Sequence, residues 1–223
     1  MITILIRTAV IGVGYLGKFH AQKYASLPHS QLVAVCDTNL STAQQLATEL
    51  NTQAVDSIDA IIDDIDALSI VVPTQKHHAI ARQCLLAGKH VLLEKPMTTT
   101  VDEARELIEI AHDKQVILQI GHLERFNPAI LALDEILHTP LFIESHRVAP
   151  FNPRGADVNV ILDLMIHDID IILDIVDADV VNIDAKGVAV LSNDIDIANA
   201  RIKFANGCVA NVTASRAGLK SER

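Results

Sequence analysis

The segment that decides the fold of this chain is TAVIGVGYLG, residues 8–17. An apolar run typical of a strand leads into a GxGxxG turn, and a helical pattern over residues 15–26 follows. Gly12 permits a tight turn, Gly14 lets the backbone approach a pyrophosphate, and Gly17 lets helix and strand pack closely. Since a helix N-terminus attracts phosphate, we also expect Tyr15 and Leu16 beside a bound dinucleotide.

Asp37 ends the next predicted strand, twenty residues after Gly17. A carboxylate at this position accepts hydrogen bonds from the adenosine ribose hydroxyls and repels a 2′-phosphate. No arginine follows at positions 38 and 39. The sequence therefore predicts NAD as the cofactor, in preference to NADP. The alternatives are an ordinary strand-to-helix turn for the glycines and a strand-end cap for Asp37.

Short apolar runs alternate with helical patterns as far as Gly121. Strands are predicted over residues 8–11, 31–36, 53–55, 67–72, 90–93 and 116–120, and helices over residues 15–26, 41–50, 58–63, 76–87 and 101–114. Such alternation indicates βαβ units with right-handed crossovers. The predicted fold class is α/β, with a Rossmann doubly wound parallel sheet over residues 1–121.

The pattern changes in residues 122–223. We expect helices over residues 128–137 and 160–175, a loop over 149–159, and strands over 141–148, 180–190, 195–204 and 208–214. Ala205-Asn206-Gly207 is a hairpin signal. These elements predict an α+β domain for substrate binding and oligomerisation, with an open, mainly antiparallel sheet. Because few strands are available, we expect this domain to be incomplete at its C-terminus or completed by another subunit.

Composition excludes several function classes. A formal net charge of −10 argues against a nucleic-acid partner, because phosphate backbones need a basic face. No apolar run reaches the roughly twenty residues of a membrane span. The three cysteines are far apart and have no metal-like spacing, so we expect free thiols, no metal site and a cytoplasmic location.

Polar residues follow three predicted strands, where an open parallel sheet binds its ligands. They are Pro73-Thr74-Gln75-Lys76-His77-His78, Glu94-Lys95-Pro96 and Gly121-His122. On the predicted helix 160–175, Asp163, His167, Asp170 and Asp174 are spaced by four, three and four and share one face. Solvated loops and the wet stripe of an amphipathic helix are the alternatives.

The chain resembles the Gfo/Idh/MocA family of NAD(P)-dependent sugar and cyclitol oxidoreductases. The resemblance rests on GVGYLG, Asp37, PTQKH at 73–77, AGKHVLLEKP at 87–96 and GHLERFNP at 121–128. It implies a dehydrogenase acting on CH–OH groups, with Lys95 beside the nicotinamide and the reacting hydroxyl. It also implies a cofactor pocket shaped by Pro73, Thr74, His77 and Glu94, although a helix-start or surface role remains the alternative for His77. His78 is expected to have no role in the site.

The second domain carries the family's D-x-G-x-H-x-x-D pattern from Asp163 to Asp170, with Met165 in place of the glycine. Because that glycine eases close packing, the local geometry is expected to differ. The resemblance makes His167 the general base, its ordinary pKa being close to working pH. It makes Asp163 a substrate ligand or an orienting group for the imidazole, whereas Asp170 is expected to support the helix or neighbouring residues.

The segment GHLERFNP resembles members of the family that oxidise nucleotide-linked amino sugars, such as UDP-N-acetylglucosamine, at the 3-hydroxyl. It implies a substrate site that includes Arg125 and Asn127, where Arg125 either pairs with the diphosphate or joins structural elements. The family also implies homo-oligomers built through the second-domain sheet. Two other functions stay open: reduction of an imine or tetrapyrrole, and a truncated, non-catalytic NAD-binding protein.

Overall fold

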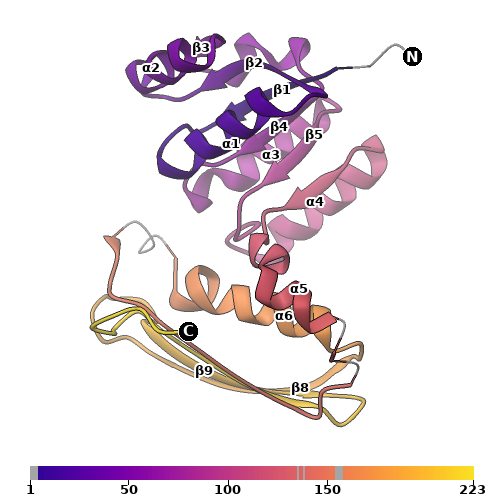
Figure 1. Ribbon diagram of the computed structural model, residues 1–223, viewed down its shortest axis with the longest axis vertical. Coiled ribbons are helices and arrows are strands. Elements are labelled where there is room, and N and C mark those ends of the chain that lie inside the picture. Colours follow the sequence, from indigo (N-terminus) through magenta and orange to yellow (C-terminus); the bar gives the residue numbers. More distant parts are fainter. Residues whose placement is uncertain (1–4, 135, 138, 154–157) are drawn as a thin grey trace. The chain divides into compact units, whose positions relative to one another are not determined.

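A computed structural model describes residues 5–134, 136–137, 139–153 and 158–223 of the chain. The chain divides into two compact units, residues 1–121 and 122–223 (Figure 1). The first contains a six-stranded sheet and the second a four-stranded sheet.

All the strands of the first sheet run parallel, in the order β3-β2-β1-β4-β5-β6. They are β1 (Ile6–Ile11), β2 (Ser30–Cys36), β3 (Gln53–Val55), β4 (Ala67–Ile70), β5 (His90–Leu93) and β6 (Leu118–Ile120). This order is that of a doubly wound sheet, so the predicted α/β fold class is confirmed. The winding reverses between β1 and β4, and ligands of such sheets bind beyond the carboxyl ends of the strands at that point.

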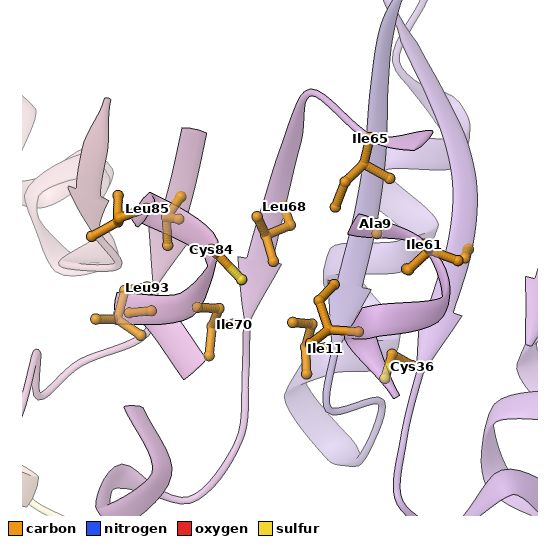
Figure 2. Close-up of a cluster of buried hydrophobic side chains, with 14 of the residues drawn as sticks. Ala9, Ile11, Cys36, Ile61, Ile65, Leu68, Ile70, Cys84, Leu85 and Leu93 are labelled. Atoms are coloured by element: carbon orange, nitrogen blue, oxygen red, sulfur yellow. The ribbon is translucent and has the colours of Figure 1, made fainter. Parts of the chain in front are cut away.

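Alternate residues of β1 face two separate cores because side chains alternate across a strand. Val10 packs with residues of α1 (Tyr15–Ser26) and α2 (Leu40–Leu50). Ala9 and Ile11 pack in the opposite core with residues of α3 (His77–Leu86) and α4 (Val101–Lys114), part of which Figure 2 shows. The predicted helix 58–63 is instead a pair of 3-10 turns, Ile58–Ala60 and Ile62–Asp64.

Two cysteines belong to the core shown in Figure 2. Burial raises the pKa of Cys36 to about 11 and that of Cys84 to about 12. Cys208 is also buried, and all three thiols are free. Thiols in this state are poor nucleophiles, so they act as small apolar side chains.

The second sheet has the order β7-β10-β9-β8, with β7 parallel to β10 and the other pairs antiparallel. Its strands are β7 (Phe142–Val148), β8 (Val180–Val188), β9 (Ile197–Phe204) and β10 (Val209–Ser215). The mainly antiparallel sheet is confirmed, and so is the hairpin after Phe204, where Gly207 has a φ of 90°. The helix predicted over 128–137 is α5 (Pro128–Asp134). Residues 135 and 154–157 of the predicted helix and loop lie outside the described residues.

The helix predicted over residues 160–175 is not continuous. A π-helical turn, Ile161–Met165, precedes α6 (Ile166–Ile175). The Oδ1 atom of Asn159 accepts hydrogen bonds from the backbone N–H groups of Ile161 and Leu162 at 3.1 Å each. Met165 is only 2% exposed and packs in the core against β9 and β10. The departure from a regular helix therefore falls at the Met that replaces the glycine of the sequence pattern.

A buried carboxylate stabilises the connection between β8 and β9. Asp196 is fully buried, and its Oδ2 accepts the backbone N–H groups of Val190, Leu191 and Ser192 at 2.6–2.8 Å. Arg216 donates to Oδ1 at 2.7 Å. Burial by itself would raise the pKa of Asp196, but these hydrogen bonds hold it well below its usual range.

The buried pair of Asp196 and Arg216 predicts that the folded protein loses stability in acid. An unfolded aspartate has a pKa of about 3.9, so the stabilisation is fully present above that pH. It decreases as the pH falls below about 4 towards the lower pKa of the folded state. Urea unfolding of Asp196→Asn at pH 7 should show a lower midpoint and a flatter dependence on acid pH than the wild type. Identical pH dependences would contradict the assignment.

Candidate active site

The glycine turn after β1 has the shape of a dinucleotide cradle. Gly12 has a φ of 81°, and a Cβ atom there would meet the backbone of Val71. A Cβ atom on Gly17 would collide with the carbonyl oxygen of Gly12. A Cβ atom on Gly14, the N-cap of α1, would meet nothing within 4 Å. Packing therefore explains why positions 12 and 17 require glycine. The open space at Gly14 leaves room for a pyrophosphate on the helix N-terminus.

Asp37 lies beside this turn. Its Oδ2 accepts the backbone N–H of Val13 and its Oδ1 that of Asn39, both at 2.9 Å. These bonds hold the carboxylate at the end of β2, next to the glycine turn. Tyr15 and Leu16, 67% and 49% exposed, lie on the first turn of α1. The residues present therefore fit an NAD site: a cradle for the pyrophosphate and an acceptor for the ribose.

His77 joins two strand-end loops. It begins α3 after Pro73 and the 3-10 turn Thr74–Lys76, and it is 1% exposed. Nδ1 lies 2.8 Å from the carbonyl oxygen of Pro96, and Nε2 lies 2.9 Å from that of Val72. Since carbonyl oxygens only accept, both bonds form together only when both ring nitrogens carry a proton. His77 is thus no surface histidine, whereas His78 pairs with Glu106 at 2.8 Å on the outside of the unit.

The segment after β5 places Lys95 next to a buried carboxylate. Glu94 is 7% exposed, and its Oε2 accepts the backbone N–H of Lys95 at 3.3 Å. The peptide bond between Lys95 and Pro96 is cis, and the side chain of Lys95 is half-buried. Glu94 also contacts His20 of α1, which sequence reasoning missed. His20 lies one turn after Gly17 on the buried face of α1, and a polar residue at such a position is the signal that would have found it.

In the second unit, Asp163 lies in the π-helical turn and His167 in the first turn of α6, and both are half-buried. Glu124 is close enough to His167 for their charges to interact. Burial would raise the pKa of Glu124, but a hydrogen bond from Asn127 at 3.3 Å and the positive charges of Arg223 and Arg147 hold it below its usual value. Glu124 was not among the site residues predicted from the sequence. Asn127, which was, donates its side-chain hydrogen bond to Glu124.

The side chain of Arg125 binds acidic residues of its own unit. It forms a two-pronged pair with Asp170 at 2.7 and 2.8 Å and a third contact with Asp174 at 2.5 Å. The bond to Asp170 is the main reason that the pKa of Arg125 is raised. This geometry favours the structural interpretation of Arg125, and it gives Asp170 the expected supporting role.

The remaining acid of the helix also has a structural partner. Asp168 forms a buried, two-pronged ion pair with Arg147 of β7 at 2.6 and 2.9 Å. Asp163 and His167 are the candidates for chemistry on this stripe, because the family pattern gives them those roles. Within the described residues, no group of three or more His, Cys, Asp or Glu side chains is arranged to hold a metal ion.

Comparison with known families and proteins gives matches along both units. Residues 6–122 match the oxidoreductase family with an NAD-binding Rossmann fold, GFO_IDH_MocA, and residues 142–222 match the GFO/IDH/MocA C-terminal domain. The chain belongs to the Gfo/Idh/MocA family of NAD-binding oxidoreductases. The resemblance inferred from the motifs is thereby confirmed, and so is NAD as the cofactor.

Individual relatives are similar over nearly the whole chain. UDP-N-acetylglucosamine 3-dehydrogenase of Acidithiobacillus ferrooxidans is 46% identical over 212 residues, which cover 95% of this chain and 67% of the relative. Its solved structure superposes with a TM-score of 0.92 at 45% identity, covering 99% of this chain and 73% of that one. The scyllo-inositol 2-dehydrogenase (NAD(+)) of Bacillus subtilis is 29% identical over 231 residues, covering 95% of this chain and 67% of the relative.

Proposed function

We propose that this chain uses NAD to oxidise a secondary hydroxyl of a sugar or nucleotide sugar, and that its substrate is UDP-N-acetylglucosamine, oxidised at the 3-hydroxyl. The observation that carries this proposal is the 46% identity to a UDP-N-acetylglucosamine 3-dehydrogenase, on a chain that keeps Lys95, Asp163 and His167. In the described part of the chain, no helix has the length and apolar character that a membrane span requires.

The proposed chemistry uses residues of the family motifs. His167 removes the proton of the reacting hydroxyl as a general base, and Asp163 binds a neighbouring hydroxyl or orients the imidazole. Lys95 holds the hydroxyl oxygen and assists the proton transfer. Bound NAD would supply the acceptor for the hydride of the reacting carbon. The cofactor would be held by Gly12, Gly14, Gly17 and Asp37. The other residues expected around it are Tyr15, Leu16, Pro73, Thr74, His77 and Glu94.

The deciding experiment follows NADH formation with UDP-N-acetylglucosamine, free sugars and inositols. Turnover of the nucleotide sugar alone supports the proposal. Turnover of free sugars or inositols would support NAD-dependent oxidation of a hydroxyl but contradict a nucleotide sugar as the substrate. Reduction of imines with NADH, without activity on sugars, would favour the imine or tetrapyrrole alternative. NAD binding without any turnover would favour a non-catalytic dinucleotide binder.

Asp37→Ser should weaken NAD binding by about 10- to 100-fold, because hydrogen bonds to a charged group contribute about 1.5–3 kcal/mol. It should also reduce the preference for NAD over NADP, since the charge that repels a 2′-phosphate is gone. Isothermal titration calorimetry with both cofactors measures this. Asp113→Ser, which removes an 81% exposed carboxylate of the same unit, is the matched control. An unchanged preference in Asp37→Ser would contradict the role of Asp37.

We propose that copies of the chain associate through the second-domain sheet. We also propose that the protein works in the cytoplasm. Alternate residues of β9 and β10 face the core, while Arg201, Asn211 and Thr213 lie on the opposite face of the sheet. Arg201 donates to Asn211 there at 2.9 Å. Analytical ultracentrifugation of the wild type and of Arg201→Glu tests whether copies of the chain associate through this face.

The three free thiols support the proposed location, because free thiols are typical of a reducing compartment.

A further inference from the structure

A line of hydrogen bonds runs through the first unit from α1 to the residue before Lys95. The hydroxyl of Tyr24 lies 2.7 Å from Oγ of Ser69, and the same Oγ lies 3.1 Å from Nδ1 of His20. Nε2 of His20 lies 3.1 Å from Oε1 of Glu94. The other carboxylate oxygen of Glu94 accepts the backbone N–H of Lys95. The line thus links the helix that follows the glycine turn to the segment that carries Lys95.

The line is shielded from water. Ser69 is fully buried in β4, and the side chains of His20 and Glu94 are 14% and 9% exposed. Burial is the main cause that raises the pKa of Tyr24, so its hydroxyl keeps its proton and can donate. Buried hydrogen bonds of this kind fix side-chain positions because an unpaired group would be costly.

The chemistry of the partners sets the direction of each bond. An ionised carboxylate only accepts, so Nε2 of His20 must carry a proton. In a neutral ring Nδ1 is then the acceptor, and Ser69 donates to it. The oxygen of Ser69 in turn accepts from Tyr24. A neutral His20 therefore satisfies every member of the line and holds the carboxylate of Glu94 by one of its oxygens.

The carboxylate is confined on a second side as well. A Cβ atom on Gly121 would lie 2.8 Å from Oε1 of Glu94, so the backbone after β6 passes close to it. His20 and Gly121 together leave Glu94 little freedom. Since Glu94 accepts the backbone N–H of Lys95, a displaced carboxylate would displace the segment on which Lys95 is placed.

We infer that His20 is a positioning residue for Lys95 and acts through the buried carboxylate of Glu94. The inference rests on the proposed role of Lys95 at the reacting hydroxyl. In the proposed mechanism His20 touches neither substrate nor cofactor. Its effect is on the placement of Lys95, and a misplacement of about 1 Å can cost about 10²-fold in rate.

Two substitutions separate positioning from simple packing. In His20→Gln the terminal amide takes the place of Nε2 and can donate to Glu94, whereas in His20→Asn it takes the place of Nδ1 and reaches Ser69 only. We expect kcat to fall about 10- to 100-fold in His20→Asn and less than about threefold in His20→Gln. The dissociation constant of NAD should stay within about twofold in His20→Gln, which keeps the contact with Glu94. His78→Asn, in a solvated His–Glu pair of the same unit, is the control and should match the wild type.

A second measurement needs no turnover. Lysines are dimethylated with ¹³C-formaldehyde, and the Lys95 resonance is assigned by its loss in Lys95→Arg. We expect this resonance to move in His20→Asn but to keep its wild-type position in His20→Gln and His78→Asn. An unmoved resonance in His20→Asn, or equal losses of kcat in His20→Asn and His20→Gln, would overturn the inference. If no sugar is oxidised by the wild type, the proposed function fails, and the resonance alone decides the inference.

Discussion

His167→Asn is expected to oxidise the sugar substrate about 10²–10⁴-fold more slowly than the wild type, because it lacks the general base. His167 lies on α6 directly after the π-helical turn, half-buried and within electrostatic reach of Glu124. The imidazole of His167 carries a positive charge after it removes the hydroxyl proton, and the carboxylate of Glu124 lies close enough to interact with that charge. Asparagine keeps a polar side chain but cannot accept that proton at neutral pH.

The measurement is kcat for NADH formation at saturating NAD and sugar. NAD binding should be unchanged, since the glycine turn and Asp37 belong to the other unit. His112→Asn, which replaces an 89% exposed histidine of α4, is the control for the substitution itself. Near-wild-type turnover in His167→Asn would remove His167 from the proposed mechanism.

Two alanine substitutions in the glycine turn are expected to have opposite effects. Gly14→Ala should unfold at the wild-type temperature, since its Cβ meets nothing within 4 Å. It should nevertheless weaken NAD binding by about tenfold or more, which corresponds to about 1.4 kcal/mol, because the methyl group occupies the space needed by the pyrophosphate.

Gly17→Ala should mainly lower stability. Its Cβ would collide with the carbonyl oxygen of Gly12, a backbone atom that cannot rotate away. Overpacking costs about 1–3 kcal/mol, and each kcal/mol lowers Tm by about 2–4 °C in a chain of this size. Calorimetry and NAD titration of both variants provide the comparison, each variant serving as the other's control. A destabilised Gly14→Ala with unchanged NAD affinity would refute the assignment of Gly14 to the pyrophosphate.

The sequence by itself determined the architecture of the first unit and its cofactor. Strand and helix periods, the GxGxxG turn and Asp37 are local signals, each contained in a few neighbouring residues. Local chemistry also predicted the hairpin at Ala205-Asn206-Gly207. The family motifs then indicated Lys95, Asp163 and His167 by position along the chain, without any knowledge of their surroundings.

Only the tertiary structure decided which polar residues support others. Arg125 and Asp170 lie 45 positions apart, and His20 and Glu94 lie 74 apart, so neither pair leaves a pattern within one element. The π-helical turn that ends at Met165 likewise emerges only in the tertiary structure, where that side chain packs in the core with β9 and β10. Buried polar groups need partners wherever the fold brings them, and the free energy that selects these partners comes from contacts distant in sequence.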